Sequence, residues 1–400
     1  MLSRKSAGIK SSAVRELLKF AKDAEFISLA GGIPATDLID IEGIDASIQK
    51  ITSGEHRHVF QYSVTEGEEN LRNEIANWNK SFQFETSADN IIITNGSQQA
   101  IDLLNRVFLE KGDTVLVERP TYLAALQLFG YTDATVAEMS YQDGKIDLAA
   151  LEQTLAAGGI KMLYLTPCFA NPTGTSISEA DRTTIVKLTH QYQVVVIEDD
   201  PYGHLRFSGE SIKPLYTIAQ ELYGSDHHVC YMSSFSKIFS PGLRLGWIAI
   251  PQPFLMAVVV AKQALDLHTS TLNQHIAAHY IQSGRLNTRL ALLKATYKER
   301  RDLLIAALDE HLGDAITYNR PEGGMFLWCH LADDVNAAEL LNYCVEEKVV
   351  FVPGEVFFAQ DPERNSLRLS YSMLSASNAG KAAQRIARAL ARYRQDLLSK

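Results

Sequence analysis

The sequence has little cysteine, no excess of positive charge and no long hydrophobic run. Its four cysteines lie apart without CxxC spacing, which argues against a disulfide scaffold and favours reduced core thiols. A formal net charge of -9 provides no field that would attract nucleic acid or an anionic membrane surface. The most apolar run, residues 254–261, falls far short of the ~20 residues that cross a bilayer. We therefore expect a cytoplasmic protein with a small-molecule partner, and no nucleic-acid or membrane partner.

The sequence does contain short apolar runs that alternate with helical patterns. With 46% hydrophobic and 21% charged residues in a chain of 400, it has a globular composition and a length that predicts two or three domains. The segments between the runs have apolar residues at helical spacing, and Ser178 with Asp181 matches a capping box at the start of one helix. The predicted fold class is therefore α/β, with a sheet covered by helices. Its buried, mostly parallel strands are expected at residues 91–94, 114–118, 162–166, 194–198, 229–233 and 246–250.

The pattern changes after about residue 285. A long helical stretch leads into the strand-like runs MFLWCHL, VVFV and LRLSYS, which are separated by helices. We predict a large α/β domain over residues 46–285 and a smaller α+β domain over residues 286–400. Because no repeat or low-complexity linker lies between them, the two are expected to pack closely.

The most informative motif follows one of the predicted strands. Residues 233–246 read SSFSKIFSPGLRLG, so Lys237 stands at the end of a strand among hydroxyls and near Arg244. Ligands of parallel α/β sheets collect outside the carboxyl ends of the strands. The hydroxyls and Arg244 would hold a phosphate through charge-assisted hydrogen bonds and leave Lys237 free for covalent chemistry. The alternative is a polar surface turn with a solvated lysine.

Two further polar motifs follow neighbouring predicted strands. Asn-Pro-Thr-Gly occupies residues 171–174, after MLYLT, and Asp-Asp-Pro-Tyr occupies residues 199–202, after VVVIE. Taken singly, each is explained by turn chemistry, a solvated loop or a helix cap. Three such motifs at the ends of strands of one sheet would meet in one place, so together they predict a single binding site.

With other motifs along nearly the whole chain, these residues resemble a known family. The order and spacing of the motifs are similar to those of the fold-type-I pyridoxal-5′-phosphate (PLP) aminotransferases, particularly the branch with 2-aminoadipate and kynurenine aminotransferases. The resemblance implies a large domain whose mostly parallel seven-stranded sheet lies between helices, a smaller α+β domain, and an N-terminal segment, 1–45, that joins the smaller domain. The motifs are LAGGIP (29–34), FQYSVTEG (60–67), TNGSQQA (94–100), RPTY (119–122), NPTG, EDDPY, SSFSKIFSPGLRLGW, PEGGMF (321–326) and LRLSY (367–371).

The resemblance assigns chemical roles to the residues around PLP. Lys237 would form the Schiff base with the cofactor and later move the proton between the substrate α-carbon and the cofactor. Asp199 would keep the pyridine nitrogen protonated, which makes the ring a better electron sink. Asn171 and Tyr202 would both bond the phenolic oxygen of the cofactor. The second aspartate, Asp200, is then expected to be structural.

The resemblance also indicates how the ring and the phosphate are held. Tyr122 would stack on the pyridine face and orient the ring, although a core or surface aromatic is the alternative. Tyr62 matches a residue that reaches the phosphate of the neighbouring subunit, which implies a homodimer with shared active sites. A helix N-terminus with free N–H groups would bind the phosphate together with hydroxyls and a guanidinium. The expected phosphate ligands are Ser97, Gln98, Ser234, Ser236 and Arg244.

The residues expected to bind substrate are fewer. Arg368 matches the arginine that binds the α-carboxylate with a bidentate fork, the alternative being a surface strand cation. Asn171 would also contact the substrate, and Gly32 would allow a close approach of the backbone, although a glycine pair is also typical of a plain turn. Arg15 matches a mobile arginine that in some relatives meets a second carboxylate, as in glutamate or 2-aminoadipate. A solvated helix cation explains Arg15 equally well.

Three other interpretations compete with this one. Residues 234–237 fit the S-x-x-K motif of penicillin-binding proteins and β-lactamases, but KTG and SDN are missing. Related PLP-binding domains serve as non-catalytic effector domains of bacterial transcription regulators, but only about 28 residues precede LAGGIP, too few for a winged-helix module. A PLP-dependent lyase shares the same fold, and the fold does not decide among PLP reactions.

We therefore expect a cytoplasmic, homodimeric PLP-dependent aminotransferase of amino-acid metabolism. It would move the amino group of an L-amino acid, such as 2-aminoadipate, glutamate, leucine or an aromatic, to a 2-oxo acid by a ping-pong mechanism. The expected acceptor is 2-oxoglutarate. Because the sequence has no HExxH motif and no other cluster with metal-ligand spacing, we expect no metal.

Overall fold

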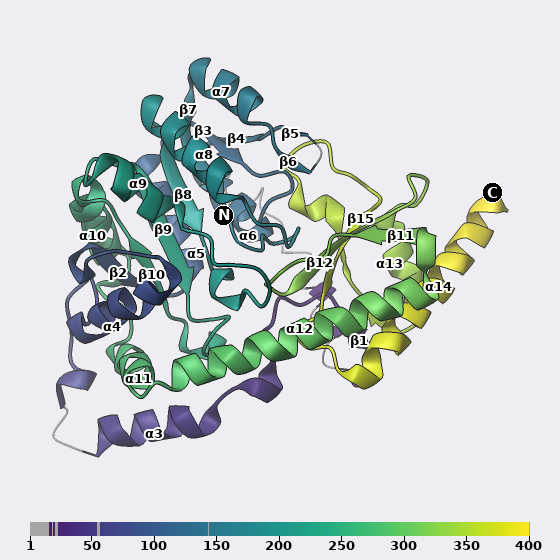
Figure 1. The fold of residues 1–400 in the computed structure, drawn as a ribbon, viewed down its shortest axis with the longest axis horizontal. Coiled ribbons are helices and arrows are strands. Elements are labelled where there is room, and N and C mark those ends of the chain that lie inside the picture. The colour runs from purple at the N-terminus through teal and green to yellow at the C-terminus, as the bar shows by residue number, and fades with distance from the viewer. Residues whose placement is uncertain (1–15, 18, 21–22, 54–56, 143, 400) are drawn as a thin grey trace, which may run out of the picture.

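Seven strands form the main sheet, in the order β2-β10-β9-β8-β7-β3-β4 (Figure 1). The computed structural model describes residues 16–17, 19–20, 23–53, 57–142 and 144–399. Strand β10 pairs antiparallel with both of its neighbours, while the other pairs are parallel, so the expected mostly parallel sheet is confirmed. The strands are β2 (Ile91–Thr94), β3 (Thr114–Val117), β4 (Thr135–Glu138), β7 (Ile160–Leu165), β8 (Val195–Asp199), β9 (Val229–Ser234) and β10 (Gly246–Ala249).

Helices cover both faces of this sheet, because successive side chains of a strand point to opposite sides. Ile92, Met162 and Ile197 belong to a buried cluster with α5 (Ser97–Phe108), α6 (Leu123–Phe129) and α10 (Gln252–Asp266). Strand residues of the opposite face pack with helices of a second, larger cluster. Those helices include α4 (Glu69–Asn79), α7 (Leu148–Ala156), α8 (Glu179–Gln191), α9 (Leu215–Tyr223) and α11 (Thr271–Gln282).

The start of α8 confirms the capping prediction. The Ser178 hydroxyl accepts a hydrogen bond from the backbone N–H of Asp181 at 3.1 Å, and the helix begins at the next residue, Glu179. Such a cap satisfies one of the free N–H groups of a first helical turn, and its loss typically costs about 1 kcal/mol.

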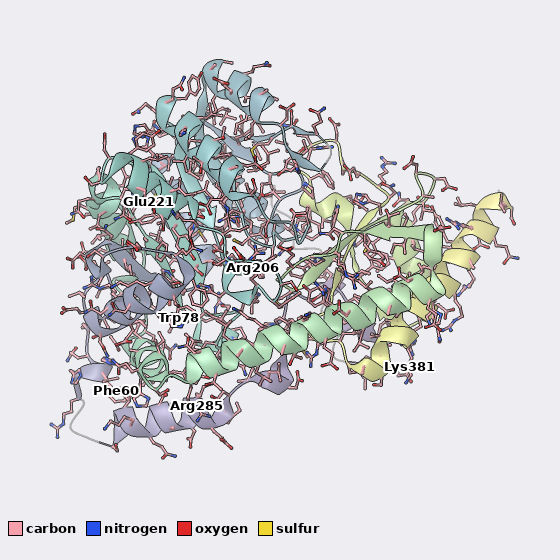
Figure 2. All side chains as sticks on the ribbon, viewed as in Figure 1. Phe60, Trp78, Arg206, Glu221, Arg285 and Lys381 are labelled. Carbon is pink, nitrogen blue, oxygen red and sulfur yellow. The ribbon has the colours of Figure 1, made fainter. Side chains whose placement is uncertain are left out.

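A second sheet has the order β11-β12-β15-β14. The long helix α12 (Arg285–His311) reaches it from the large sheet and lies along α14 (Ala376–Leu398), as Figure 1 shows. At the start of α12, Arg285 donates hydrogen bonds of 2.8 and 2.7 Å to the carboxylate of Asp40, which precedes α3 (Ile41–Thr52) (Figure 2). Further elements are β11 (Ile316–Tyr318), β12 (Phe326–Leu331), α13 (Ala337–Glu346), β15 (Ser366–Ser370) and the hairpin β5 (Tyr141–Gln142) with β6 (Lys145–Ile146).

The VVFV run differs from the expectation of one strand. Its first half, β13 (Val349–Val350), pairs in parallel with β1 (Ile27–Ser28), whereas β14 (Val352–Pro353) pairs antiparallel with β15. The fully buried Phe351 lies between the two halves. Pro353 has no N–H to donate, which suits the edge position of β14 and ends the ladder early.

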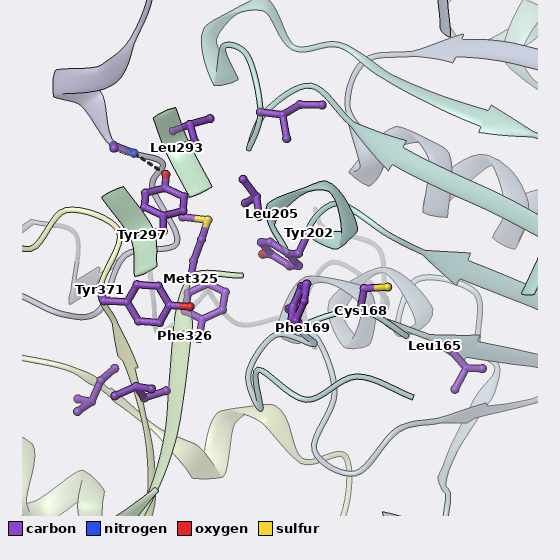
Figure 3. Close-up of a cluster of buried hydrophobic side chains, with 14 of the residues drawn as sticks. Leu165, Cys168, Phe169, Tyr202, Leu205, Leu293, Tyr297, Met325, Phe326 and Tyr371 are labelled. Atoms are coloured by element: carbon purple, nitrogen blue, oxygen red, sulfur yellow. Dashed lines mark hydrogen bonds between the residues drawn. The ribbon is translucent and has the colours of Figure 1, made fainter. Parts of the chain in front are cut away.

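The two sheets meet through an apolar cluster (Figure 3). Phe169, Tyr202 and Leu205, from the loops after β7 and β8, face Phe326 of the second sheet and Met325, which directly precedes it. Tyr202 and Phe326 make an edge-to-face contact with ring centroids 5.8 Å apart. The carboxyl end of the main sheet is therefore covered by the second sheet. No helix among the described residues is long and apolar enough to cross a membrane.

Candidate active site

A cavity of about 350 Å³ lies at the carboxyl ends of β7, β8 and β9, against the second sheet. The structure brings together here the predicted site residues except Tyr62 and Arg15. The predicted residues that line the cavity are Gly32, Ser97, Gln98, Tyr122, Asn171, Asp199, Tyr202, Ser234, Ser236, Lys237, Arg244 and Arg368.

Lys237 extends into this cavity from the turn after β9. Its Nζ donates a hydrogen bond of 2.7 Å to the carbonyl oxygen of Gly32. Burial, together with the cations Arg368 and Arg244, lowers the pKa of Lys237 to about 8, although the carboxylate of Asp199 acts in the opposite direction. The uncharged fraction of this amine near neutral pH is thus larger than for an ordinary lysine. An uncharged amine is nucleophilic, so Lys237 is suited to covalent chemistry.

Asp199 is the last residue of β8 and is buried. Its Oδ2 accepts a hydrogen bond of 2.6 Å from the hydroxyl of Tyr164, while its Oδ1 has no partner among the described residues. Burial raises the pKa of Asp199 to about 7. Burying a carboxylate oxygen without a hydrogen-bond partner costs free energy of folding. A cationic N–H donor from a ligand would offset that cost. Asp200, by contrast, accepts from the N–H of Gly203 at 2.7 Å and does not line the cavity.

The start of α5 and the turn after β9 form a cradle for an anion. Gly96 precedes the helix with φ 78, and a Cβ atom on it would lie 2.9 Å from Nη2 of Arg244. Glycine therefore permits both this backbone conformation and the close approach of the guanidinium. On the other side, the hydroxyl of Ser234 donates to that of Ser236 at 2.9 Å. Free helical N–H groups, hydroxyls and a guanidinium are the donors that a phosphate requires.

Arg368 reaches the cavity from β15 of the second sheet. Its Nη1 donates to Oδ1 of Asn171 at 2.6 Å and its Nη2 to the carbonyl oxygen of Ala30 at 2.6 Å. The guanidinium also lies over the rings of Phe326 and Phe357, 4.3 and 5.1 Å from their centroids. Burial lowers the pKa of Arg368 to about 10, which leaves it charged at neutral pH. The arrangement presents a fixed cation that no carboxylate of the described residues neutralises by a salt bridge.

Two predicted residues stand apart from this group. Tyr62 is 80% exposed, and its ring makes an edge-on contact with His268 at 5.9 Å. It does not line the cavity of its own chain. Arg15 lies outside the described residues, so its place relative to the cavity stays a prediction.

Sequence reasoning missed two buried residues that support the cavity from behind, Tyr164 and Glu118, which bond to its lining residues Asp199 and Thr166. Tyr164 lies within the apolar run MLYLT, where an aromatic is ordinarily part of the core. Glu118 ends another apolar run, and its Oε2 accepts from the N–H of Thr166 at 2.6 Å. Burial raises the pKa of Glu118 to about 8. The sequence signal available for Glu118 was its position as an acidic residue directly after the apolar residues 115–117. Tyr164 had no comparable signal, because it lies inside an apolar run.

The donor set fits PLP, the cofactor that the sequence resemblance implies. The buried Oδ1 of Asp199 has no partner within the described part of the chain, which suits a protonated pyridine nitrogen. The cradle of Gly96 and Arg244 suits the phosphate, and Lys237 has the lowered pKa that attack on a carbonyl carbon requires. Among the described residues, no group of three or more His, Cys, Asp or Glu side chains is placed to hold a metal ion.

Comparisons with known proteins agree with this geometry. Residues 24–386 match the model of the family described as aminotransferase class I and II. Aromatic-amino-acid aminotransferase 1 of Thermococcus litoralis is 36% identical over 391 residues, which cover 96% of this chain and 93% of that protein. The kynurenine aminotransferase of Pyrococcus horikoshii superposes with a TM-score of 0.91 at 34% identity, covering 98% of this chain and 97% of that one.

A further solved structure bears on the cofactor. The alpha-aminoadipate aminotransferase LysN of Thermus thermophilus, complexed with N-(5'-phosphopyridoxyl)-L-leucine, has a TM-score of 0.90 and 35% identity to this chain. The alignment covers 98% of this chain and 97% of that one. The bound molecule joins a phosphopyridoxyl group to an amino acid, so in that relative the fold holds cofactor and substrate together.

Proposed function

The chain belongs to the class I and II aminotransferases and is a PLP-dependent transaminase. We propose that it moves the amino group of an aromatic, aliphatic or acidic L-amino acid to 2-oxoglutarate. The two half-reactions would follow each other in a ping-pong order. One observation carries the proposal: Lys237, with a pKa lowered to about 8, shares a cavity with the guanidinium of Arg368 and with Oδ1 of Asp199, which no described residue bonds.

Each of these groups has a distinct task in the proposed reaction. When bound, PLP supplies a carbonyl carbon that attaches an amine and a protonated ring that accepts the electron pair released at the substrate Cα. Lys237 would bind the cofactor covalently. Once displaced by substrate, its amine would take the proton from the substrate Cα and deliver it to the cofactor carbon that carries the amino group. Asp199 would hold the proton on the pyridine nitrogen, because an adjacent carboxylate favours the cationic form.

The remaining cavity residues would orient the reactants. Asn171 and Tyr202 would donate to the phenolic oxygen, and Tyr122, whose pKa burial raises to about 12, would stack on the ring as a neutral phenol. Fixing the ring this way aligns the bond to be broken with the electron sink. The phosphate would be held by the cradle of Ser97, Gln98, Ser234, Ser236 and Arg244.

Substrate would bind between Arg368 and the N-terminal segment. The α-carboxylate would take the place next to the Arg368 guanidinium, near Asn171. Gly32 would let the backbone approach the substrate closely. A Cβ atom at position 32 would already lie 3.2 Å from Phe326, so the space there is too narrow for a side chain. The relatives named for aromatic amino acids, kynurenine and alpha-aminoadipate support a broad choice of side chain. For acidic donors we propose Arg15 as the partner of the second carboxylate.

We propose that the active form is a cytoplasmic homodimer in which Tyr62 reaches the phosphate of the neighbouring subunit. Its 80% exposure and position outside its own cavity support this role, and the four buried, unpaired cysteines suit a reducing compartment. In this proposal residues 46–285 form the cofactor domain, and residues 286–400 with the segment 1–45 form the smaller one.

Mixing two inactive variants tests the shared site. In a hybrid of Lys237→Ala and Tyr62→Ala chains, a Tyr62 that acts across the interface leaves one site with both defects and the other with neither. We expect about half of the wild-type activity per hybrid dimer. A hybrid dimer with no activity beyond that of the parents would contradict the exchange of Tyr62.

Absorbance spectra test the proposed reaction. The purified protein should show the band of a cofactor bound to lysine, and a single amino acid without acceptor should convert that band to the band of the aminated cofactor. Adding 2-oxoglutarate should restore the first band, with stoichiometric release of the donor's 2-oxo acid. Ammonia release with a 2-oxo acid would instead identify a lyase, and a band unchanged by every amino acid would identify a non-catalytic effector domain. Lys237→Ala is the negative control.

A further inference from the structure

We propose that Tyr164 is a positioning residue for the cofactor: its hydroxyl holds Oδ2 of Asp199 so that Oδ1 stays available to the pyridine nitrogen. The inference rests on the proposed role of Asp199. The Tyr164 hydroxyl donates to Oδ2 at 2.6 Å, and Oδ1 is buried without a partner among the described residues. The carboxylate thus has one oxygen fixed by the protein and one left for a ligand.

The pairing of β7 with β8 explains why Tyr164 reaches this carboxylate (Figure 1). In the parallel register Tyr164 lies opposite Ile197, and Ile197 and Asp199 point to the same face because they are two positions apart. A long aromatic side chain can reach a diagonal neighbour on the adjacent strand. A shorter residue at position 164 would leave the carboxylate without its donor.

Tyr164 is itself held in place. Its ring is fully buried and packs edge-to-face against Phe129 of α6, with centroids 5.6 Å apart. Burial and the charge of Asp199 raise its pKa well above the ordinary value of 10, so it remains a donor at every physiological pH. A donor that is both rigid and permanently protonated can fix one orientation of the carboxylate.

The hydrogen bond also affects the ionisation of Asp199. Burial is the largest influence and raises the pKa, which is about 7 even though the bond from Tyr164 lowers it. Without the hydroxyl, a larger share of Asp199 would be protonated at neutral pH and unable to keep the pyridine nitrogen charged. The other charged or titratable groups near this carboxylate are Asp200 at the end of β8, Lys237 after β9, Glu118 after β3, Tyr122 before α6 and Tyr202 after β8.

Tyr164→Phe isolates the hydroxyl, because the ring and its packing are kept. In the holoenzyme we expect kcat to fall ~10- to 100-fold with the KM for the amino acid donor changed less than about threefold, since the lost bond is to a charged group remote from the substrate carboxylate. The acid limb of the pH–kcat profile should move to higher pH, and the cofactor dissociation constant, measured by titrating apoprotein with PLP, should rise. An unchanged acid limb and an unchanged dissociation constant would overturn the proposal.

Tyr231→Phe is the matched control. Tyr231 is a buried tyrosine of the neighbouring strand β9 whose hydroxyl donates to Oδ2 of Asp200 at 3.4 Å. Its loss should leave kcat, the pH profile and PLP affinity within about twofold of wild type. Equal effects of both substitutions would overturn the assignment, because they would show a general response to a lost buried hydroxyl.

A double-mutant cycle separates this inference from the proposed function. If Tyr164 acts through Asp199, adding Tyr164→Phe to Asp199→Asn should cause no further rise in the PLP dissociation constant. Additive effects would overturn the inference while leaving the transaminase intact. Failure of the wild-type protein to transfer an amino group would refute the proposed function instead, and the PLP titration of the apoprotein would still report whether Tyr164 and Asp199 are coupled.

Discussion

Arg368 and Asn171 are joined by a hydrogen bond of 2.6 Å, from Nη1 of the arginine to Oδ1 of the amide. The residue proposed for the substrate α-carboxylate is therefore in direct contact with the residue proposed for the phenolic oxygen of the cofactor. The second bond, from Nη2 to the carbonyl oxygen of Ala30, fixes the plane of the guanidinium from the other side. The fork is oriented before substrate arrives, which limits the entropy lost on binding.

Arg368→Lys should therefore raise the KM for the amino acid about 10- to 100-fold and lower kcat less. Lysine keeps the charge but presents one flexible ammonium instead of a planar fork, and it cannot hold Asn171 and Ala30 at once. Steady-state kinetics at saturating acceptor measure the change. The exposed Arg388 of α14, which pairs with Glu347, gives the control Arg388→Lys, and a KM within twofold of wild type for Arg368→Lys would argue against the carboxylate role.

Gly96→Ala tests the phosphate cradle against an internal control. Gly96 and Gly112 both have positive φ, 78 and 95, so alanine should strain the backbone at each, by about 1 kcal/mol or more. Only at Gly96 would the new Cβ meet Nη2 of Arg244, at 2.9 Å, since nothing lies within 4 Å at Gly112. We expect both variants to lose stability and Gly96→Ala alone to lose PLP affinity, by ~10-fold or more. Equal PLP affinities in equilibrium titrations would contradict the cradle.

Asp199→Asn should stabilise the apoprotein above pH 7. Burial raises the folded-state pKa to about 7 from an ordinary value of 3.8. Between these values the folded chain keeps a proton that the unfolded chain has released, so the free energy of unfolding falls as pH rises through this window. Asparagine avoids the fall and should gain about 4 kcal/mol at pH 8, since each pKa unit corresponds to about 1.4 kcal/mol.

Urea unfolding of the two apoproteins across that pH range measures the difference. The exposed Asp334 supplies the control Asp334→Asn, which should follow the wild-type curve. Parallel curves for wild type and Asp199→Asn would show that the carboxyl is not destabilised by burial. The same variant should lose most of its transaminase activity, because a neutral amide does not keep the pyridine nitrogen protonated.

The attachment of PLP to the apoprotein should depend on pH through Lys237. Because burial lowers its pKa to about 8, the nucleophilic free amine grows as pH rises and levels off above about 8. Stopped-flow absorbance after mixing apoprotein with PLP gives the rate, and borohydride reduction followed by mass spectrometry identifies the modified lysine. A rate that still rises steeply at pH 10, as for an ordinary lysine, would contradict the lowered pKa, and Lys237→Ala should show no covalent label.

The sequence predicted the main sheet and most of the cavity because their signals are local. Strands such as β2 and β8 are buried on both faces and therefore read as unbroken apolar runs. Asp199 directly follows such a run, and Lys237 and Asn171 lie in the short turns after two others, so placing the strands also places these residues. Parallel pairing then brings residues that are far apart in the sequence to one edge.

Other parts of the site had no local signal. The role of Tyr164 depends on its register against Ile197 in the next strand, which no single run reveals. The edge strand β4 is only partly buried, so its residues lack the apolar pattern of the central strands. The division of VVFV between two sheets depends on which partners lie nearby in the fold.

Lys262 offers a final prediction, away from the reacting groups. Its side chain is fully buried and donates to both carboxylate oxygens of Asp266, at 2.9 and 3.0 Å. Oδ2 of Asp266 also accepts from Asn95 at 2.7 Å and from Gln99 at 2.6 Å. This network fixes the turn that precedes Ser97, the first residue of α5.

Lys262→Met should therefore lower both stability and PLP affinity. Removing one partner of a buried ion pair typically costs about 3–5 kcal/mol, and the partial exposure of Asp266 puts the expectation nearer 2 kcal/mol. Replacing both residues, as Lys262→Met with Asp266→Leu, should recover part of the stability but not the affinity, because Asn95 and Gln99 then lose the carboxylate that accepts their hydrogen bonds. Urea unfolding and PLP titration separate the two effects, with the exposed Lys187→Met as control. Recovery of PLP affinity in the double variant would show that the network matters only for folding and not for the shape of the phosphate cradle.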